Sequence, residues 1–221
     1  MGPVRNLTKI DIGRLISIPI FTYFMTIRIY ILYGDIRILL PINTVKLLGT
    51  IHHLLIVFFY VLIILLYFLR NPARLTNRSL VTNTIAILAT FIPFVLPVLS
   101  KHELINPIIV IMADIIIILG MIISIYSLSV LGKSFSIIPQ ARRLVQRGPY
   151  RLVRHPLYLG ELMSVFGIVL AGLSISKIAV YFLLISCQIY RAFQEEKLLA
   201  KAFPEYEDYC SKTARFIPGL F

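Results

Sequence analysis

The sequence predicts an all-α integral membrane protein, a helical bundle of about six hydrophobic helices. Of its 221 residues, 58% are hydrophobic and only 14% are charged. The mean hydropathy is +0.88. Apolar runs of about 20 residues recur between short polar segments, and a run of that length is enough to cross a bilayer as a helix. Because backbone groups in lipid must bond to each other, helices are the expected elements, and a chain of this length predicts a single structural domain.

Six apolar segments define the predicted helices. The short basic start of the chain and the lack of a small-residue cleavage pattern predict that the first segment is a span and not a cleaved signal. Pro93 and Pro97 predict a kink in the third segment. The last two segments are joined by only a few residues, so we expect a C-terminal helical hairpin whose first arm is short for a full crossing. The predicted helices are residues 15–33, 51–69, 80–99, 104–131, 157–173 and 175–193.

The basic residues predict the orientation in the membrane. With six crossings, most Lys and Arg fall on the side of the N-terminus, including Arg5 and Lys9, and few on the other, so both termini should be cytoplasmic. A net charge of +12 would suggest nucleic acid in a soluble chain, but here it favours a membrane surface with its lipids as partner, and no nucleic acid. Cys187 and Cys210 lie in no CxxC pattern, which predicts no metal site.

One long basic segment interrupts the apolar runs, from residue 132 to residue 158. It contains turn signals at Gly148-Pro149 and His155-Pro156 and ends where the fifth helix is predicted to begin. Such a donor-rich loop beside a membrane favours an anionic ligand. Its six cations are Lys133, Arg142, Arg143, Arg147, Arg151 and Arg154.

The motifs of the C-terminal part resemble those of the isoprenylcysteine carboxyl methyltransferase and phospholipid methyltransferase superfamily. They read LGKSFS at 131–136, LVQRGPY at 144–150, VRHPLYLG at 153–160, RAFQEEKLL at 191–199, and FPEYEDY followed by RFIP at 203–218. The resemblance implies S-adenosylmethionine as methyl donor, S-adenosylhomocysteine as product, and a cytoplasmic cofactor pocket. It divides the chain into a four-helix membrane region, 1–131, and a cofactor-binding and catalytic region, 132–221.

The resemblance assigns cofactor binding to a set of residues around the predicted hairpin. Pro156 suits the first position of a helix, so a helix N-terminus should open beside His155 and favour the cofactor's carboxylate. Gly160 would allow close backbone approach. The alternative is that Arg-His-Pro only caps a helix at the membrane edge. The implied cofactor-binding residues are Arg154, His155, Pro156, Tyr158, Gly160, Glu196 and Tyr206.

Arg191 and Glu195 are the implied catalytic residues. They are four apart, so on a helix they share one face, and the alternative is a surface salt bridge. Glu195 or Glu196 could hold the cofactor's amino group or ribose, or accept a proton, and Arg191 could hold an anionic substrate. The aromatic residues after Phe203 predict a segment folded over the site, covering the adenine, or an interfacial anchor.

The favoured function is carboxyl O-methylation of an isoprenylcysteine-like substrate that enters from the bilayer. A carboxylate is already a nucleophile at pH 7, whereas an amine must first lose a proton. One alternative is N-methylation of a phospholipid amine. The other is a non-enzymatic transporter or scaffold whose basic loop only follows the positive-inside rule.

Five further polar residues fall within or beside apolar segments. Arg28 and Asp114 lie at matching depths of the first and fourth helices, which predicts that they pair. The alternative is that Arg28 reaches the outer headgroups without a partner. His52 and His53 are predicted to be interfacial at the outer edge of the second helix. Glu161 lies one turn into the fifth helix and could face the cofactor pocket, although a carboxylate at the membrane edge is the simpler interpretation.

Overall fold

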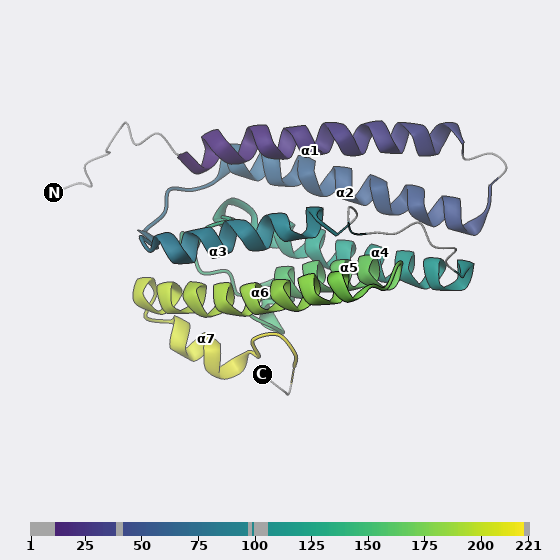
Figure 1. The fold of residues 1–221 in the computed structure, drawn as a ribbon. Helices are drawn as coiled ribbons and strands as arrows, with labels where there is room; N and C mark the ends of the chain where they lie inside the picture. The colour runs from purple at the N-terminus through teal and green to yellow at the C-terminus, as the bar shows by residue number, and fades with distance from the viewer. Residues whose placement is uncertain (1–11, 39–41, 97–98, 100–105, 219–221) are drawn as a thin grey trace.

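The computed structural model describes residues 12–38, 42–96, 99 and 106–218. Figure 1 shows a bundle in which α1 and α2 lie side by side, α6 runs along the opposite side of the bundle, and the short α7 lies below α6. The helices are α1 Ile12–Arg37, α2 Thr44–Leu69, α3 Leu80–Phe91, α4 Pro107–Leu131, α5 Pro156–Leu170, α6 Ile175–Ala202 and α7 Tyr206–Lys212. The two short strands are β1 Leu75–Thr76 and β2 Gln140–Ala141.

Within the part of the chain that the structure describes, three helical segments are long and apolar enough to cross a membrane, namely Thr44–Leu69, Pro107–Ser134 and Ile175–Ala202. Two shorter apolar segments, Leu80–Phe94 and Pro156–Leu170, accompany them. These segments confirm the predicted all-α membrane bundle. The number of crossings stays a prediction.

Several helices have other bounds than the sequence predicted, and the largest differences at a C-terminal end fall in the third and the sixth helix. The third helix ends at Phe91 and continues as a 3₁₀ turn, Ile92–Phe94, whereas the sequence predicted one kinked helix to residue 99. Pro93 explains the early end, because it has no N–H to donate and so cannot continue the α-helical hydrogen bonds. Pro97 lies outside the described residues. The sixth helix runs nine residues beyond its predicted end at 193, to Ala202, so Arg191 and Glu195 lie on one continuous helix.

Glycines bring α4 and α5 into close contact. A Cβ at Gly120 would lie 2.5 Å from the Ser164 backbone nitrogen, and a Cβ at Gly160 would lie 2.5 Å from Ser124 Oγ. A Cβ at Gly167 would lie 2.6 Å from an Ile117 side-chain carbon. Small residues at a helix interface allow such approach in membranes, where packing replaces the hydrophobic effect between helices.

Loops and the C-terminal segment form one layer across the end of the bundle where α2 ends and α5 begins. The strands β1 and β2 pair antiparallel, which joins the α2–α3 connection to the basic segment. The Arg154 N–H donates to the Ala214 carbonyl at 2.8 Å, and the His155 N–H donates to the Arg215 carbonyl at 3.2 Å. The C-terminal segment is therefore attached to the start of α5.

The opposite half of the bundle contains two histidine–carboxylate pairs. His52 Nδ1 lies 3.1 Å from Asp114 Oδ1, and His53 Nδ1 lies 2.5 Å from Asp35 Oδ2. The predicted pair between Arg28 and Asp114 is wrong, because His52 takes the carboxylate while Arg28 lies beside Tyr60 and lines a cavity. The two histidines are partly buried and link α2 to α4 and α1, so they are not simple interfacial residues.

Candidate functional site

A cavity of about 240 Å³ lies within the bundle and reaches the layer of loops. Its polar wall is formed by residues of the basic segment before α5 and by residues of α5, α6 and α7. Its apolar wall comes from α1, α2, α3 and the middle of α5 and α6, including Phe21, Ile56, Phe59, Phe94, Val165 and Leu184. The cavity therefore offers space for a ligand with one polar and one apolar part.

Tyr158, Arg191 and Glu195 meet on the polar wall. The Tyr158 hydroxyl donates to Glu195 Oε1, and the Arg191 guanidinium carbon lies 4.8 Å from the centre of the Tyr158 ring. Arg191 also donates from Nη2 to the Ile137 carbonyl at 2.9 Å. Its Nε is buried and has no hydrogen-bond partner among the described residues. One guanidinium donor is thus available to an anionic ligand.

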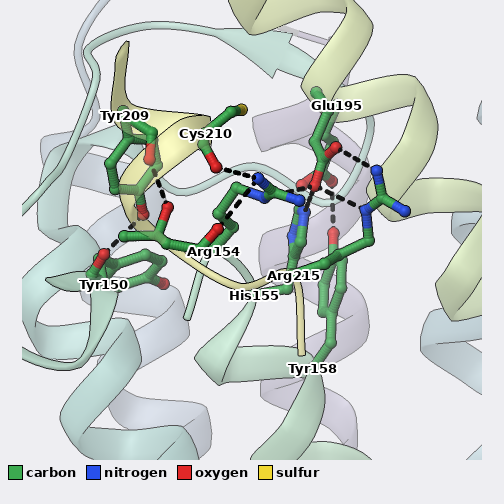
Figure 2. A network of polar contacts seen from close by, with 10 residues as sticks. Tyr150, Arg154, His155, Tyr158, Glu195, Tyr209, Cys210 and Arg215 are labelled. Carbon is green, nitrogen blue, oxygen red and sulfur yellow. Dashed lines mark hydrogen bonds and ion pairs between the residues drawn. The ribbon is translucent and has the colours of Figure 1, made fainter. Parts of the chain in front are cut away.

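Glu196 joins three segments outside the cavity wall. It accepts hydrogen bonds from Arg154 Nε at 3.1 Å and His155 Nε2 at 3.0 Å, at the start of α5. It also accepts from Arg215 Nε at 3.0 Å and Nη2 at 2.9 Å, from the C-terminal segment. Hydrogen bonding to Glu196 raises the pKa of the Arg215 guanidinium. Figure 2 shows Arg154, His155 and Arg215 close together beside Glu195 of α6.

The C-terminal segment folds over the cavity opening. The Tyr209 hydroxyl donates to the Tyr150 carbonyl at 2.6 Å (Figure 2), and Arg154 Nη1 donates to the carbonyls of Cys210 and Thr213, both at 3.1 Å. Tyr206 is 3% exposed, and its buried hydroxyl has no hydrogen-bond partner among the described residues. Burial raises the pKa of Tyr209 to about 12, so the hydroxyl is protonated at neutral pH.

The structure brings six of the nine predicted site residues together on the cavity wall: Arg154, His155, Tyr158, Arg191, Glu195 and Tyr206. The other three lie beside it. Pro156 occupies the first position of α5, as the sequence predicted. Gly160 faces Ser124 in the contact with α4, which accounts for the glycine by helix packing. The Glu196 carboxylate forms ion pairs with Arg154, His155 and Arg215.

The sequence interpretation favoured a membrane-edge position for Glu161 and did not identify Gln188, yet both line the cavity. Gln188 is 1% exposed; its Nε2 donates to Glu161 Oε2 at 2.8 Å, and its Oε1 accepts from Arg191 Nη1 at 3.3 Å. The signal was available in the spacing, because Gln188 lies three residues before Arg191 and thus on the same face of one helix. We call Glu161, Gln188, Arg191, Tyr158 and Glu195 the polar seam.

Within the described ranges, no three His, Cys, Asp or Glu side chains gather in a way that could hold a metal ion. The polar groups of the cavity wall are hydroxyls, carboxylates, amides, guanidinium groups and an imidazole. Such groups bind organic ligands through hydrogen bonds and charge.

Residues 108–206 match the phospholipid methyltransferase family, a family of membrane methyltransferases. The match covers α4 to the start of α7 and includes the whole polar seam. It confirms the resemblance predicted from the motifs.

Two curated proteins are similar to this chain. The cobalt-zinc-cadmium resistance protein CzcN of Cupriavidus metallidurans is 38% identical over 80 residues, which are 35% of this chain and 36% of that protein. The nickel-cobalt-cadmium resistance protein NccN of Alcaligenes xylosoxydans xylosoxydans is 34% identical over 84 residues, 37% of this chain and 38% of that protein. The matched part spans little more than a third of the length of either relative.

Proposed function

We propose that the protein transfers a methyl group from S-adenosylmethionine to a lipophilic acceptor in the membrane. The acceptor class that the cavity fits best is a carboxylate on an apolar chain, such as an isoprenylcysteine. The observation that carries the proposal is the cavity itself, whose polar wall falls within the part of the chain that matches the methyltransferase family. Its other wall is apolar and suits a hydrocarbon chain.

The residues of the polar wall fit the groups of S-adenosylmethionine. The Glu195 carboxylate could accept hydrogen bonds from the cofactor's amino group or ribose hydroxyls. The cofactor's carboxylate could accept hydrogen bonds from His155 or from the backbone N–H groups at the start of α5. Tyr206 supplies a buried ring and a hydroxyl with no partner among the described residues, which suits an adenine. The bound cofactor supplies an electrophilic methyl group on a sulfonium. No side chain needs to form a covalent bond with it.

The chain's own contribution is then positioning and exclusion of water. Arg191 is held by the Ile137 carbonyl and Gln188 and offers Nε to the acceptor carboxylate. Tyr158 orients Glu195 through its hydroxyl. The segment around Tyr209 covers the site on the polar side. Correct placement of two reactants in a dry site accounts for most of the rate enhancement expected for a simple displacement.

We further propose that the layer of loops faces the cytoplasm, where S-adenosylmethionine is dissolved. The many Lys and Arg residues in the loops at this end of the bundle support that orientation. The acceptor would then reach the apolar wall from the bilayer. The two relatives are named for resistance to metals, and the proposal rests on the family match and the cavity.

Calorimetric titration of the detergent-purified protein with S-adenosylhomocysteine tests the cofactor. We expect saturable binding, and a ten- to hundred-fold weaker affinity in Glu195→Ala, roughly the loss of one hydrogen bond to a charged group. Absence of saturable binding at millimolar ligand would favour a non-enzymatic transporter or scaffold.

Incubation with methyl-labelled S-adenosylmethionine, a farnesylated cysteine and phosphatidylethanolamine tests the acceptor. We expect a base-labile methyl ester on the farnesylated cysteine. Base-stable label in phosphatidylethanolamine would instead establish N-methylation of a lipid amine and overturn the carboxylate assignment.

A further inference from the structure

Glu161 is the deepest acidic residue of the polar seam. It follows Tyr158 by three residues in α5, which places it about 4.5 Å further from the start of that helix. Its partner Gln188 precedes Glu195 by seven residues in the antiparallel α6 and thus lies about 10 Å deeper. Beyond these two, most of the cavity wall is apolar and includes Val165 and Leu184, with polar exceptions that include Ser164 and Arg28. Glu161 therefore lies where the polar wall meets the apolar wall.

The Glu161 carboxylate has unused acceptor capacity. The bond from Gln188 is its only hydrogen bond to any residue that the structure describes, and it goes to one of the two carboxylate oxygens. An ionised carboxylate offers about four acceptor positions. A carboxylate within an apolar helix is costly unless a partner or a ligand meets it. Because Glu161 lines the cavity, a ligand in the cavity can supply the missing donor.

Arg191 and Glu161 are separated by a single side chain, the Gln188 amide that bonds both. A ligand that reaches both must therefore place an anionic group and a hydrogen-bond donor a few bonds apart. Its apolar chain must then leave on the Glu161 side, toward Val165 and Leu184.

We propose that Glu161 is a specificity-determining residue that accepts a hydrogen bond from an N–H group next to the acceptor's carboxylate. This inference rests on the proposed function and narrows the acceptor to N-acylated amino acids that bear an apolar chain. A simple prenyl or fatty acid has the carboxylate and the chain but lacks the N–H. No bond to Glu161 is made or broken, and the residue acts only in recognition.

The test compares two probes that differ only in the acetamido group that carries the N–H, N-acetyl-S-farnesyl-cysteine and S-farnesyl-3-thiopropionic acid. Calorimetry gives the binding of each probe, and methyl labelling gives kcat/KM for each. The wild-type protein should favour the probe with the N–H roughly ten- to hundred-fold, as expected for one hydrogen bond to a charged group. In Glu161→Ala this ratio should fall to near one.

Two further variants separate recognition from folding. Glu161→Gln keeps the size of the side chain and one acceptor oxygen, so its ratio should lie between those of the wild type and Glu161→Ala. Asp208→Ala removes an exposed carboxylate outside the cavity and should keep the wild-type ratio. A ratio near one in the wild type, or a wild-type ratio in both folded Glu161 variants, would overturn the inference.

The outcomes also separate this inference from the proposed function. Discrimination between the probes in binding without methyl transfer would refute the methyltransferase and leave the role of Glu161 intact. Equal methylation of both probes would establish the transferase and refute the role of Glu161. Failure of both probes to bind would refute both the role and the acceptor class.

Discussion

Glu196→Ala should release the C-terminal segment from the start of α5. Glu196 is the shared acceptor of Arg154, His155 and Arg215, and its side chain is 11% exposed, while those of Arg154 and Arg215 are 11% and 16% exposed. Removing one partner of a buried ion pair costs about 3–5 kcal/mol, because the remaining charges lose their counter-charge. Partial exposure to water reduces this figure, so we expect about 2–3 kcal/mol. The fraction of molecules in which the C-terminal segment is released should rise roughly thirty- to hundred-and-fifty-fold.

Hydrogen exchange measured by mass spectrometry in detergent checks this expectation. The backbone N–H groups of Arg154 and His155 donate to the C-terminal segment, so their exchange reports its release directly. Asp208→Ala breaks the Asp208–Lys212 pair, whose side chains are each 69% exposed, and is the matched control that should change nothing. Unchanged exchange of both amides in Glu196→Ala, beside a control that behaves as stated, would refute the reasoning.

Three further predictions concern single contacts between elements of the bundle. Gly160→Ala should lower stability by about 1–3 kcal/mol, because its Cβ would lie 2.5 Å from a serine hydroxyl of α4, whereas Gly49→Ala, with open space around it, should not; melting curves in detergent compare them. Asp114→Asn and a change of His52 to Gln should show coupled effects on the melting temperature, and additive effects would argue against the pair. Tyr209→Phe should cost about 1 kcal/mol. Because burial raises the pKa of Tyr209 from 10 to about 12, this contribution should persist below pH 10 and disappear as the pH rises through about 12; a loss near pH 8 would contradict it.

The helices were predictable because composition and apolar run length determine them. The ends of the helices were less predictable, since they depend on single residues. Pro93 ended α3 early, where the sequence suggested only a kink. The sixth helix continued through Arg191 and Glu195 to Ala202, because charged residues outside the bilayer core extend a helix as well as apolar ones do.

Pairing between distant side chains was the part that sequence could not determine. Matching depth made Arg28 and Asp114 plausible partners, but depth does not specify which faces of two helices meet. The rotation of α2 brings His52 to Asp114. Glu196 shows the same limit, because the resemblance assigned it to cofactor binding, whereas its ion pair with Arg215 required the C-terminal segment to fold back.

The two walls of the cavity differ in how far the family match covers them. The polar seam lies wholly within residues 108–206, the part that matches the family, so the family match supports what is proposed for the methyl donor. Much of the apolar wall comes from α1, α2 and α3, through residues such as Phe21, Ile56, Phe59 and Phe94, all outside that match. Because an acceptor chain would contact those residues, the shape of its apolar part is specified by helices that the comparison does not cover. Relatives that share only the matched part are therefore guides to the donor end of the reaction, and the acceptor has to be established on this chain itself.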